Sequence, residues 1–280
     1  MRSPACIFTV DVEDWFHILD VPGTPAFEDW TQMPSRVEQN FRYMLNIFAE
    51  ADVKVTMFVL SWIAEKFPAL IKEAYDQGHE IASHGYKHEL VYTIGKERFA
   101  EDIKRSKGML EELIGEPVNG YRAPGFSVTE DTPWFFEELT KAGFTYDSSV
   151  FPGSRGHGGL ESAPNEPYKV KTEHGPIMEF PISLSTFMGK ELYFFGGGYL
   201  RFFPYLLIHK KINDVLKEER PVIFYLHPRE IDPEQPRLEM SAKRKFMTYY
   251  NISSVEGKMK KIFRDHKIST FRDHIKRISV

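Results

Sequence analysis

His84 and His88 are the side chains whose spacing first suggests metal chemistry. They lie in the segment Ser83-His84-Gly85-Tyr86-Lys87-His88. On a helical turn, residues four apart face the same way, so both imidazoles could reach one metal ion. The spacing alone would favour two surface histidines near a helix start, but the pair directly follows a predicted strand. Two imidazoles with one carboxylate suit zinc and other first-row metals and leave positions open for water and substrate.

A cluster of acids could supply that carboxylate. Asp11, Glu13 and Asp14 fall within four residues at the end of an apolar run. Such acids repel one another unless a cation or a basic residue is near. One carboxylate could bind the metal while another acts as a general base. A solvated acidic turn is the alternative, and it would be preferred if the histidine pair were absent.

Two further polar residues follow predicted strands. His227 comes after Phe224-Tyr225-Leu226, where it could be a hydrogen-bonded core residue or a general acid near neutral pH. Arg122 could be an ordinary surface cation, or it could pair with the free aspartate and orient it.

The elements that must position these residues alternate along the chain. Short β-rich runs occupy residues 6–12, 53–60, 79–83, 117–122, 144–147, 175–180, 221–226 and 267–271, and helical patterns occupy 36–51, 62–77, 96–114, 132–142, 202–219 and 255–266. This alternation predicts an α/β fold with a mostly parallel sheet, and seven or eight strands favour a distorted (β/α) barrel. Carboxyl ends of parallel strands form one rim, so the acids, the histidine pair, Arg122, Asp147 and His227 are expected to meet there.

Bulk composition is that of an ordinary globular protein, with 280 residues, 42% hydrophobic and 27% charged. A net charge of -4 argues against nucleic acid or an anionic membrane as a partner. No apolar run of 18 residues occurs, so we expect no transmembrane segment. The N-terminus reaches acids by position 11 without a secretory pattern, which predicts a cytoplasmic protein acting on an intracellular glycan intermediate. The lone Cys6 is expected to be a core residue.

Domain organisation is expected to be simple. The absence of linkers, repeats and low-complexity segments predicts one catalytic domain over residues 1–280. Residues 152–172 and 230–241 are rich in glycine, proline and polar side chains and are predicted to be loops.

Five short motifs in a fixed order resemble the polysaccharide deacetylase family, which shares the NodB homology domain and is carbohydrate esterase family 4. They are Thr9-Val10-Asp11-Val12-Glu13-Asp14, Ser83-His84 to His88, Arg122-Ala123-Pro124, Asp147-Ser148-Ser149 and Leu226-His227. Each motif is weak alone, but all five in order are specific. The segments VDVEDWFH, FFGGGYLRFFPY and YLHPREID resemble the branch associated with exopolysaccharide and surface-glycan gene clusters, whose C-terminal extension would be residues 228–280.

The resemblance implies a role for each residue that matches a motif. Asp11 would be the catalytic base and His227 the general acid. Arg122 would orient Asp11, and Asp147 would tune His227. His84 and His88 would bind a divalent metal, with zinc favoured and cobalt, nickel or another first-row metal also suitable.

Three departures from the family pattern affect the expected site. The acids are spaced unusually, and we favour Asp14 as the metal ligand with Glu13 as the competitor. Gly125 replaces the tyrosine whose backbone N–H helps to form the oxyanion hole, so Phe126 would supply the aromatic wall. Phe151-Pro152 stands in place of the family's tryptophan. Tyr86, Trp15, Phe16 and Phe126 could be sugar platforms, although packing explains each of them as well.

The expected function is metal-dependent removal of acetyl groups from an N-acetylated sugar or glycan. Two alternatives stay open, a related C–N hydrolase acting on ureides or formamido sugars and an inactive relative that only binds glycans. A glycosidase with paired carboxylates would leave the histidines unexplained.

Overall fold

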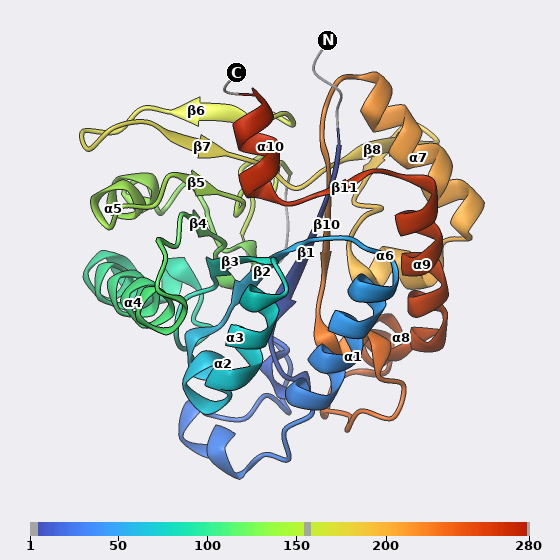
Figure 1. Cartoon of the computed structure of the whole chain (residues 1–280), viewed down its shortest axis with the longest axis horizontal. Helices are drawn as coiled ribbons and strands as arrows, with labels where there is room; N and C mark the ends of the chain where they lie inside the picture. The colour runs from blue at the N-terminus through green and yellow to red at the C-terminus, as the bar shows by residue number, and fades with distance from the viewer. Residues whose placement is uncertain (1–4, 154–157, 279–280) are drawn as a thin grey trace. The chain divides into compact units, whose positions relative to one another are not determined.

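The structure is a computed structural model that describes residues 5–153 and 158–278. Figure 1 shows strands and helices alternating along most of the chain. The strands are β1 Cys6–Val12, β2 Thr56–Val59, β3 Glu80–Ser83, β4 Gly120–Tyr121, β5 Tyr146–Asp147, β6 Tyr168–Val170, β7 Ile177–Glu179, β8 Ser185–Phe187, β9 Lys190–Leu192, β10 Val222–Leu226 and β11 Ile268–Ser269. The α-helices are α1 Val37–Glu50, α2 Ser61–Lys66, α3 Pro68–Asp76, α4 Val91–Ile114, α5 Phe135–Lys141, α6 Gly197–Phe202, α7 Tyr205–Lys217, α8 Ala242–Tyr249, α9 Val255–Asp265 and α10 Phe271–Ile278.

The main sheet has nine strands in the hydrogen-bonded order β10, β1, β2, β3, β4, β5, β7, β6, with β11 beside β1. Strand β1 is parallel to β10 and β11, and β3, β4, β5 and β7 form parallel pairs. Strand β6 is antiparallel to its neighbour, β7. The predicted α/β class with a mostly parallel sheet is confirmed. The ninth strand, β6, lies within the segment 152–172 that was predicted to be a loop, and residues 154–157 of that segment lie outside the described residues.

The chain divides into two compact units, and the first contains residues 1–56 and 185–280. Its core forms around Phe8 of β1, whose ring packs against Phe48, Phe224 and Phe263 at centroid distances of 4.9–6.0 Å. The predicted C-terminal extension belongs to this unit, because β11 pairs with β1 and α9 supplies Phe263. Cys6 is buried in β1, as expected.

The second unit contains residues 57–184. Its aromatic core includes Phe99 of α4, Tyr121 of β4 and Phe135 of α5, which pack with centroid distances of 5.3–6.1 Å. Gly120 lies directly against the ring of Tyr146 on the neighbouring strand, where a Cβ would overlap the ring. Strands β4 and β5 therefore approach closely, which brings their carboxyl ends side by side.

Three predicted helices differ from the observed ones for identifiable reasons. The helix expected over 62–77 is two helices, because Pro68 starts α3. The helix expected over 202–219 is also divided, since Pro204 separates α6 from α7. Helix α4 begins earlier than predicted, at Val91, and is kinked at Gly95, whose φ is 75°.

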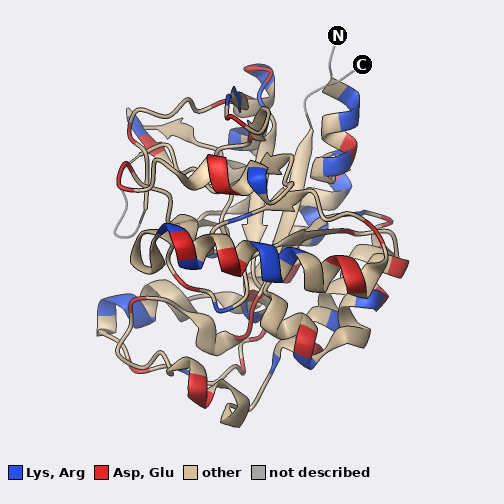
Figure 2. Cartoon of the chain, turned by 90° about the vertical axis from the view of Figure 1, so that its left-hand side faces the viewer, with Lys and Arg blue, Asp and Glu red and all other residues tan. Residues whose placement is uncertain are grey.

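Acidic and basic residues are interspersed along the helices that Figure 2 presents to the viewer. This mixture agrees with the small net charge of -4. Within the part of the chain that the structure describes, no helix has both the length and the apolar character needed to cross a membrane.

Candidate active site

The two histidines follow strand β3 on a tight turn rather than on the helical turn that their spacing suggested. Gly85 has a φ of 73° and His88 a φ of 55°, which are left-handed conformations. A Cβ at Gly85 would lie 2.8 Å from Asp102 Oδ2, so glycine is required there for space as well as for conformation. The turn brings the two imidazoles to a centroid distance of 5.3 Å.

A hydrogen bond fixes the ring of His84. Its Nδ1 lies 2.8 Å from the carbonyl oxygen of Arg122. A carbonyl can only accept, so Nδ1 carries the hydrogen and Nε2 carries the lone pair. This is the usual way in which a histidine ligand is oriented for a metal.

Asp102 of α4 holds the turn in place. Both of its carboxylate oxygens accept the backbone N–H of Tyr86, at 3.2 and 3.1 Å. Burial raises the pKa of Asp102 to about 6, although the Tyr86 N–H acts in the opposite direction. Tyr86 itself is buried, with Arg105 3.5 Å above its ring and Glu65 accepting its hydroxyl at 2.6 Å.

Asp14, the carboxylate favoured from the sequence, is occupied by local hydrogen bonds. It accepts the Trp15 N–H at 2.8 Å as the cap of the 3₁₀ helix η1, Trp15–His17. It also accepts Ser35 Oγ at 2.5 Å and the Arg36 N–H at 3.1 Å. These bonds join the strand-end loop to the start of α1, so the geometry gives Asp14 a structural setting.

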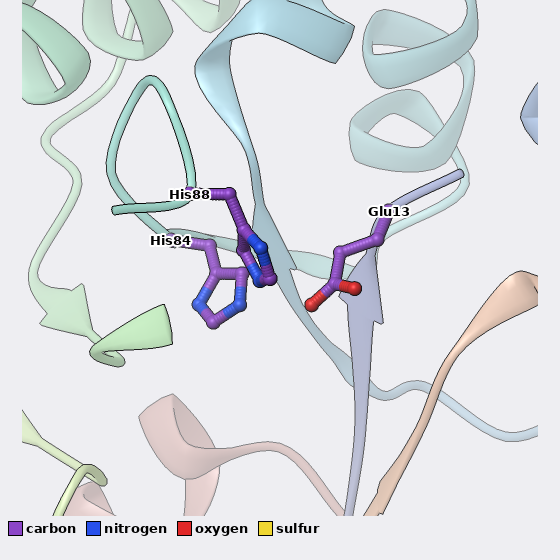
Figure 3. Close-up of side chains that lie close together, drawn as sticks. All are labelled: Glu13, His84 and His88. Atoms are coloured by element: carbon purple, nitrogen blue, oxygen red, sulfur yellow. The ribbon is translucent and has the colours of Figure 1, made fainter. Parts of the chain in front are cut away.

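Glu13 is the acid that lies near the two histidines. Glu13, His84 and His88 are all buried, and each offers one ligand atom within 4.8 Å of the others, as Figure 3 shows. Arg229 Nη1 donates to Glu13 Oε2 at 3.0 Å. The acid in this group is Glu13 rather than Asp14, and which of them binds a metal stays a prediction.

His227, at the carboxyl end of β10, faces three carboxylates. Its Nε2 lies 3.9 Å from Asp11 Oδ2 and 3.6 Å from Glu13 Oε1. Its Nδ1 lies 3.6 Å from Glu230 Oε2. Asp11, Glu13 and His227 form a second group whose ligand atoms lie within 4.8 Å of one another.

Arg122 and Asp147 lie at the ends of neighbouring strands in a buried polar network. Arg122 donates from Nε to the Ser148 carbonyl at 3.0 Å and stacks over Phe58, with its Cζ 4.0 Å from the ring centroid. Asp147 accepts Ser149 Oγ at 2.7 Å. The expected actions of Arg122 on Asp11 and of Asp147 on His227 stay predictions.

Glu179 of β7, which sequence reasoning missed, is the acidic partner of Asp147. Burial raises the pKa of Glu179 well above its usual range, and the neighbouring Asp147 raises it further. Burial also raises the pKa of Asp147, to about 6. Burial beside each other therefore disfavours the charged forms of both acids, while Glu179 Oε1 accepts the Val150 N–H at 3.0 Å. The sequence signal that could have pointed to Glu179 is that it is the one acid within the apolar run 177–180.

The expected substrate residues are mostly packing residues. Trp15 is 5% exposed and its Nε1 donates to the Pro34 carbonyl at 3.0 Å. Phe16 and Tyr86 are also buried, so these three do not form open sugar platforms in this structure. Gly125 and Phe126 lie in the 3₁₀ helix η3, Pro124–Phe126, with left-handed φ of 63° and 54°.

Two family models match the chain, and the first contains the motifs of the histidine pair and Arg122. Residues 26–146 match the family described as Polysaccharide deacetylase, and residues 148–276 match a domain of unknown function, DUF3473. The second match covers the predicted C-terminal extension and reaches further back along the chain. Residues 26–146 therefore carry a domain of the polysaccharide deacetylase family.

Individual relatives cover only part of the chain. A peptidoglycan deacetylase-like protein of Gibberella zeae is 34% identical over 97 residues, which are 35% of this chain and 28% of that protein. A peptidoglycan deacetylase of Helicobacter pylori is 30% identical over 107 residues, which are 38% of this chain and 36% of that protein. The chain thus matches about a third of the length of these curated relatives.

Solved structures with the same fold cover nearly the whole chain. A protein from Mycobacterium smegmatis assigned as a polysaccharide deacetylase has a TM-score of 0.67 and 20% identity over 99% of this chain and 91% of its own. PuuE allantoinase has a TM-score of 0.61 and 18% identity over 99% of this chain and 90% of its own. At these identities the likeness establishes the fold alone, and it confirms the barrel-type α/β architecture.

Proposed function

We propose that this protein is a metal-dependent N-deacetylase that hydrolyses the acetamido group of an N-acetylated sugar in a polysaccharide or glycan intermediate. The observation that carries the proposal is the buried donor set of Glu13, His84 and His88, close to Asp11 and His227 in the sequence motifs of a deacetylase family. The names of the curated relatives point to N-acetylglucosamine in peptidoglycan as the first substrate to test.

The donor set fits a divalent first-row metal. Two imidazole nitrogens and one carboxylate are the ligands of catalytic zinc sites, which keep a position open. The Nδ1–H of His84 already donates to a backbone carbonyl, which leaves the ring in the tautomer that a metal requires. A bound metal would supply Lewis-acid polarisation of the acetyl carbonyl and activation of the attacking water. We propose zinc as the resident ion, with cobalt and nickel as substitutes.

The residues of the chain then divide the proton transfers. Asp11 takes a proton from the attacking water, and the water oxygen adds to the acetyl carbon. A backbone N–H near Gly125 donates to the developing oxyanion. His227 gives a proton to the sugar nitrogen as the C–N bond breaks, so the products are acetate and a free amino sugar. Arg122 keeps its proposed part in orienting Asp11.

The group formed by Asp11, Glu13 and His227 raises a second assignment, in which His227 binds the metal. We favour His84 and His88 as the metal ligands. His227 Nε2 lies near both Asp11 and Glu13, which suits a histidine that exchanges a proton in the reaction. Metal content separates these assignments. His88→Ala should lose the metal, whereas His227→Ala should keep it and lose only activity.

The test of function is acetate release from purified protein loaded with zinc. The panel contains N-acetylglucosamine oligomers, free and nucleotide-linked N-acetyl sugars, a formamido sugar and a cyclic ureide. Release of acetate from an N-acetyl sugar, abolished by His88→Ala, is expected. Hydrolysis of the ureide alone would instead support a relationship of function with the allantoinase. Metal binding without any turnover would support the inactive glycan-binding alternative.

A further inference from the structure

We propose that Glu230, clamped by Arg201, is the positioning residue that holds His227 in the orientation and tautomer needed to protonate the leaving amine. This inference rests on the proposed function, in which His227 is the general acid. The family resemblance gave that role to Asp147, whose partners include Ser149 and Glu179. Glu230 and Arg201 both belong to the region described only as a domain of unknown function.

The two ring nitrogens of His227 have different neighbours. Glu230 Oε2 lies 3.6 Å from Nδ1 and accepts the backbone N–H of His227 at 3.2 Å. The same carboxylate oxygen therefore faces the main chain and the ring of one residue. Nε2 points the other way, towards Asp11 and Glu13. A carboxylate beside Nδ1 favours a hydrogen on that nitrogen, which leaves Nε2 to exchange the catalytic proton.

Glu230 is held as an anion in a buried setting. It is 5% exposed, and Arg201, also 5% exposed, donates from Nη1 to its Oε1 at 2.6 Å. Burial raises the pKa of Glu230, but its interaction with the nearby His227 and the charge of Arg201 outweigh it and lower the pKa to about 2. An ionised carboxylate can only accept hydrogen bonds, so its preference for the Nδ1–H tautomer does not vary near neutral pH.

The surrounding backbone is built to fit this carboxylate. A Cβ at Gly197 would overlap both oxygens of Glu230, and a Cβ at Gly196 would overlap the ring of Tyr225. Arg201 is fixed in turn, because its Nη2 donates to the Met247 carbonyl at 2.9 Å. The Gly196-Gly197-Gly198 segment therefore serves to bring α6 against the residues that follow β10.

The kinetic test uses Glu230→Gln, which keeps the shape but removes the charge. Each variant is assayed on an N-acetylglucosamine oligomer, whose amine must be protonated to leave, and on 4-nitrophenyl acetate, whose phenolate leaves unprotonated. We expect kcat on the amide to fall by about 10²- to 10⁴-fold, the range for loss of general acid catalysis. KM, metal content and the ester rate should change by less than about threefold. Equal losses on both substrates would overturn the proposal.

Controls separate positioning from folding. Because Glu230→Gln leaves the Arg201 charge buried, the double variant Glu230→Gln with Arg201→Met removes both charges and should fold with the same selective loss. Glu234→Gln, an exposed acid four residues on, is the matched control and should behave as wild type. If Asp147→Asn showed the amide-selective loss while Glu230→Gln did not, the positioning role would return to Asp147.

A spectroscopic test needs no turnover, so it distinguishes failure of this inference from failure of the proposed function. Nitrogen chemical shifts of His227, assigned by comparison with His227→Gln and recorded at about pH 8.5, above the ordinary pKa of a free imidazole, report which nitrogen carries the hydrogen. We expect the Nδ1–H tautomer in wild type and in Glu234→Gln, and a mixed or reversed population in Glu230→Gln. The Nε2–H tautomer in wild type, or no change in Glu230→Gln, would overturn the proposal even if the protein deacetylated no sugar.

Discussion

The buried pair of Asp147 and Glu179 should make the stability of this protein fall as the pH rises. Burial raises the pKa of both carboxyls, that of Asp147 to about 6. In the unfolded chain both titrate near their ordinary values of about 4. Between these values the folded protein holds more protons than the unfolded chain, so its stability is greatest at the acidic end and decreases as pH rises through the folded pKa.

The magnitude follows from the pKa of Asp147. A change from 3.8 to about 6 is about two pKa units, and at about 1.36 kcal/mol per unit it lowers the free energy of unfolding by roughly 3 kcal/mol at neutral pH. Glu179→Gln should remove much of the loss in free energy of unfolding that ionisation of buried Glu179 causes. The Gln oxygen can still accept the Val150 N–H, and the amide carries no charge at any pH.

Urea unfolding of wild type and Glu179→Gln from pH 5 to pH 8 measures this effect. We expect the two proteins to be similar at pH 5 and the variant to be more stable by roughly 1–3 kcal/mol at pH 8. Glu173→Gln, an exposed acid, controls for the change in net charge. Parallel profiles for wild type and Glu179→Gln, or a variant less stable at every pH, would refute the inference that burial of these two acids destabilises the folded protein at higher pH.

Three further predictions concern the metal and the backbone. Glu13→Gln should reduce bound zinc to background by elemental analysis. Asp14→Ala should keep zinc and lower the free energy of unfolding by about 1–2 kcal/mol through the lost cap; the opposite pattern would restore Asp14 as the ligand. Chelation should lower the melting temperature. Zinc at about a hundred times its Kd should raise the free energy of unfolding by about 2.7 kcal/mol. A melting curve that does not depend on metal would contradict the proposed metal site. Gly120→Ala should destabilise the fold by roughly 1–3 kcal/mol because its Cβ overlaps the Tyr146 ring, and an unchanged urea midpoint would show that the strands can separate there.

The sequence by itself determined the class of fold and the positions where chemistry collects. Apolar periodicity marked eight of the nine strands of the main sheet, because buried parallel strands are continuous apolar runs. Polar residues that follow such runs lie at one edge of the sheet, which is why the amino-acid pattern predicts a site at His84, His88 and His227. The strand β6 was not predicted because three residues are too few to establish a period, and none of the three is fully buried.

Only the tertiary structure shows which neighbours each of these residues has. Adjacent acids look alike in sequence, but capping of η1 engages Asp14, while Glu13 lies near the histidine pair. Spacing suggested a helical turn for His84 and His88, whereas left-handed backbone at Gly85 and His88 forms a tighter one. Glu179 and Glu230 could not be chosen from the sequence, because a carboxylate becomes informative only when folding buries it beside Asp147 or His227. Burial and partners, which set the pKa and the tautomer of each group, are properties of the folded chain.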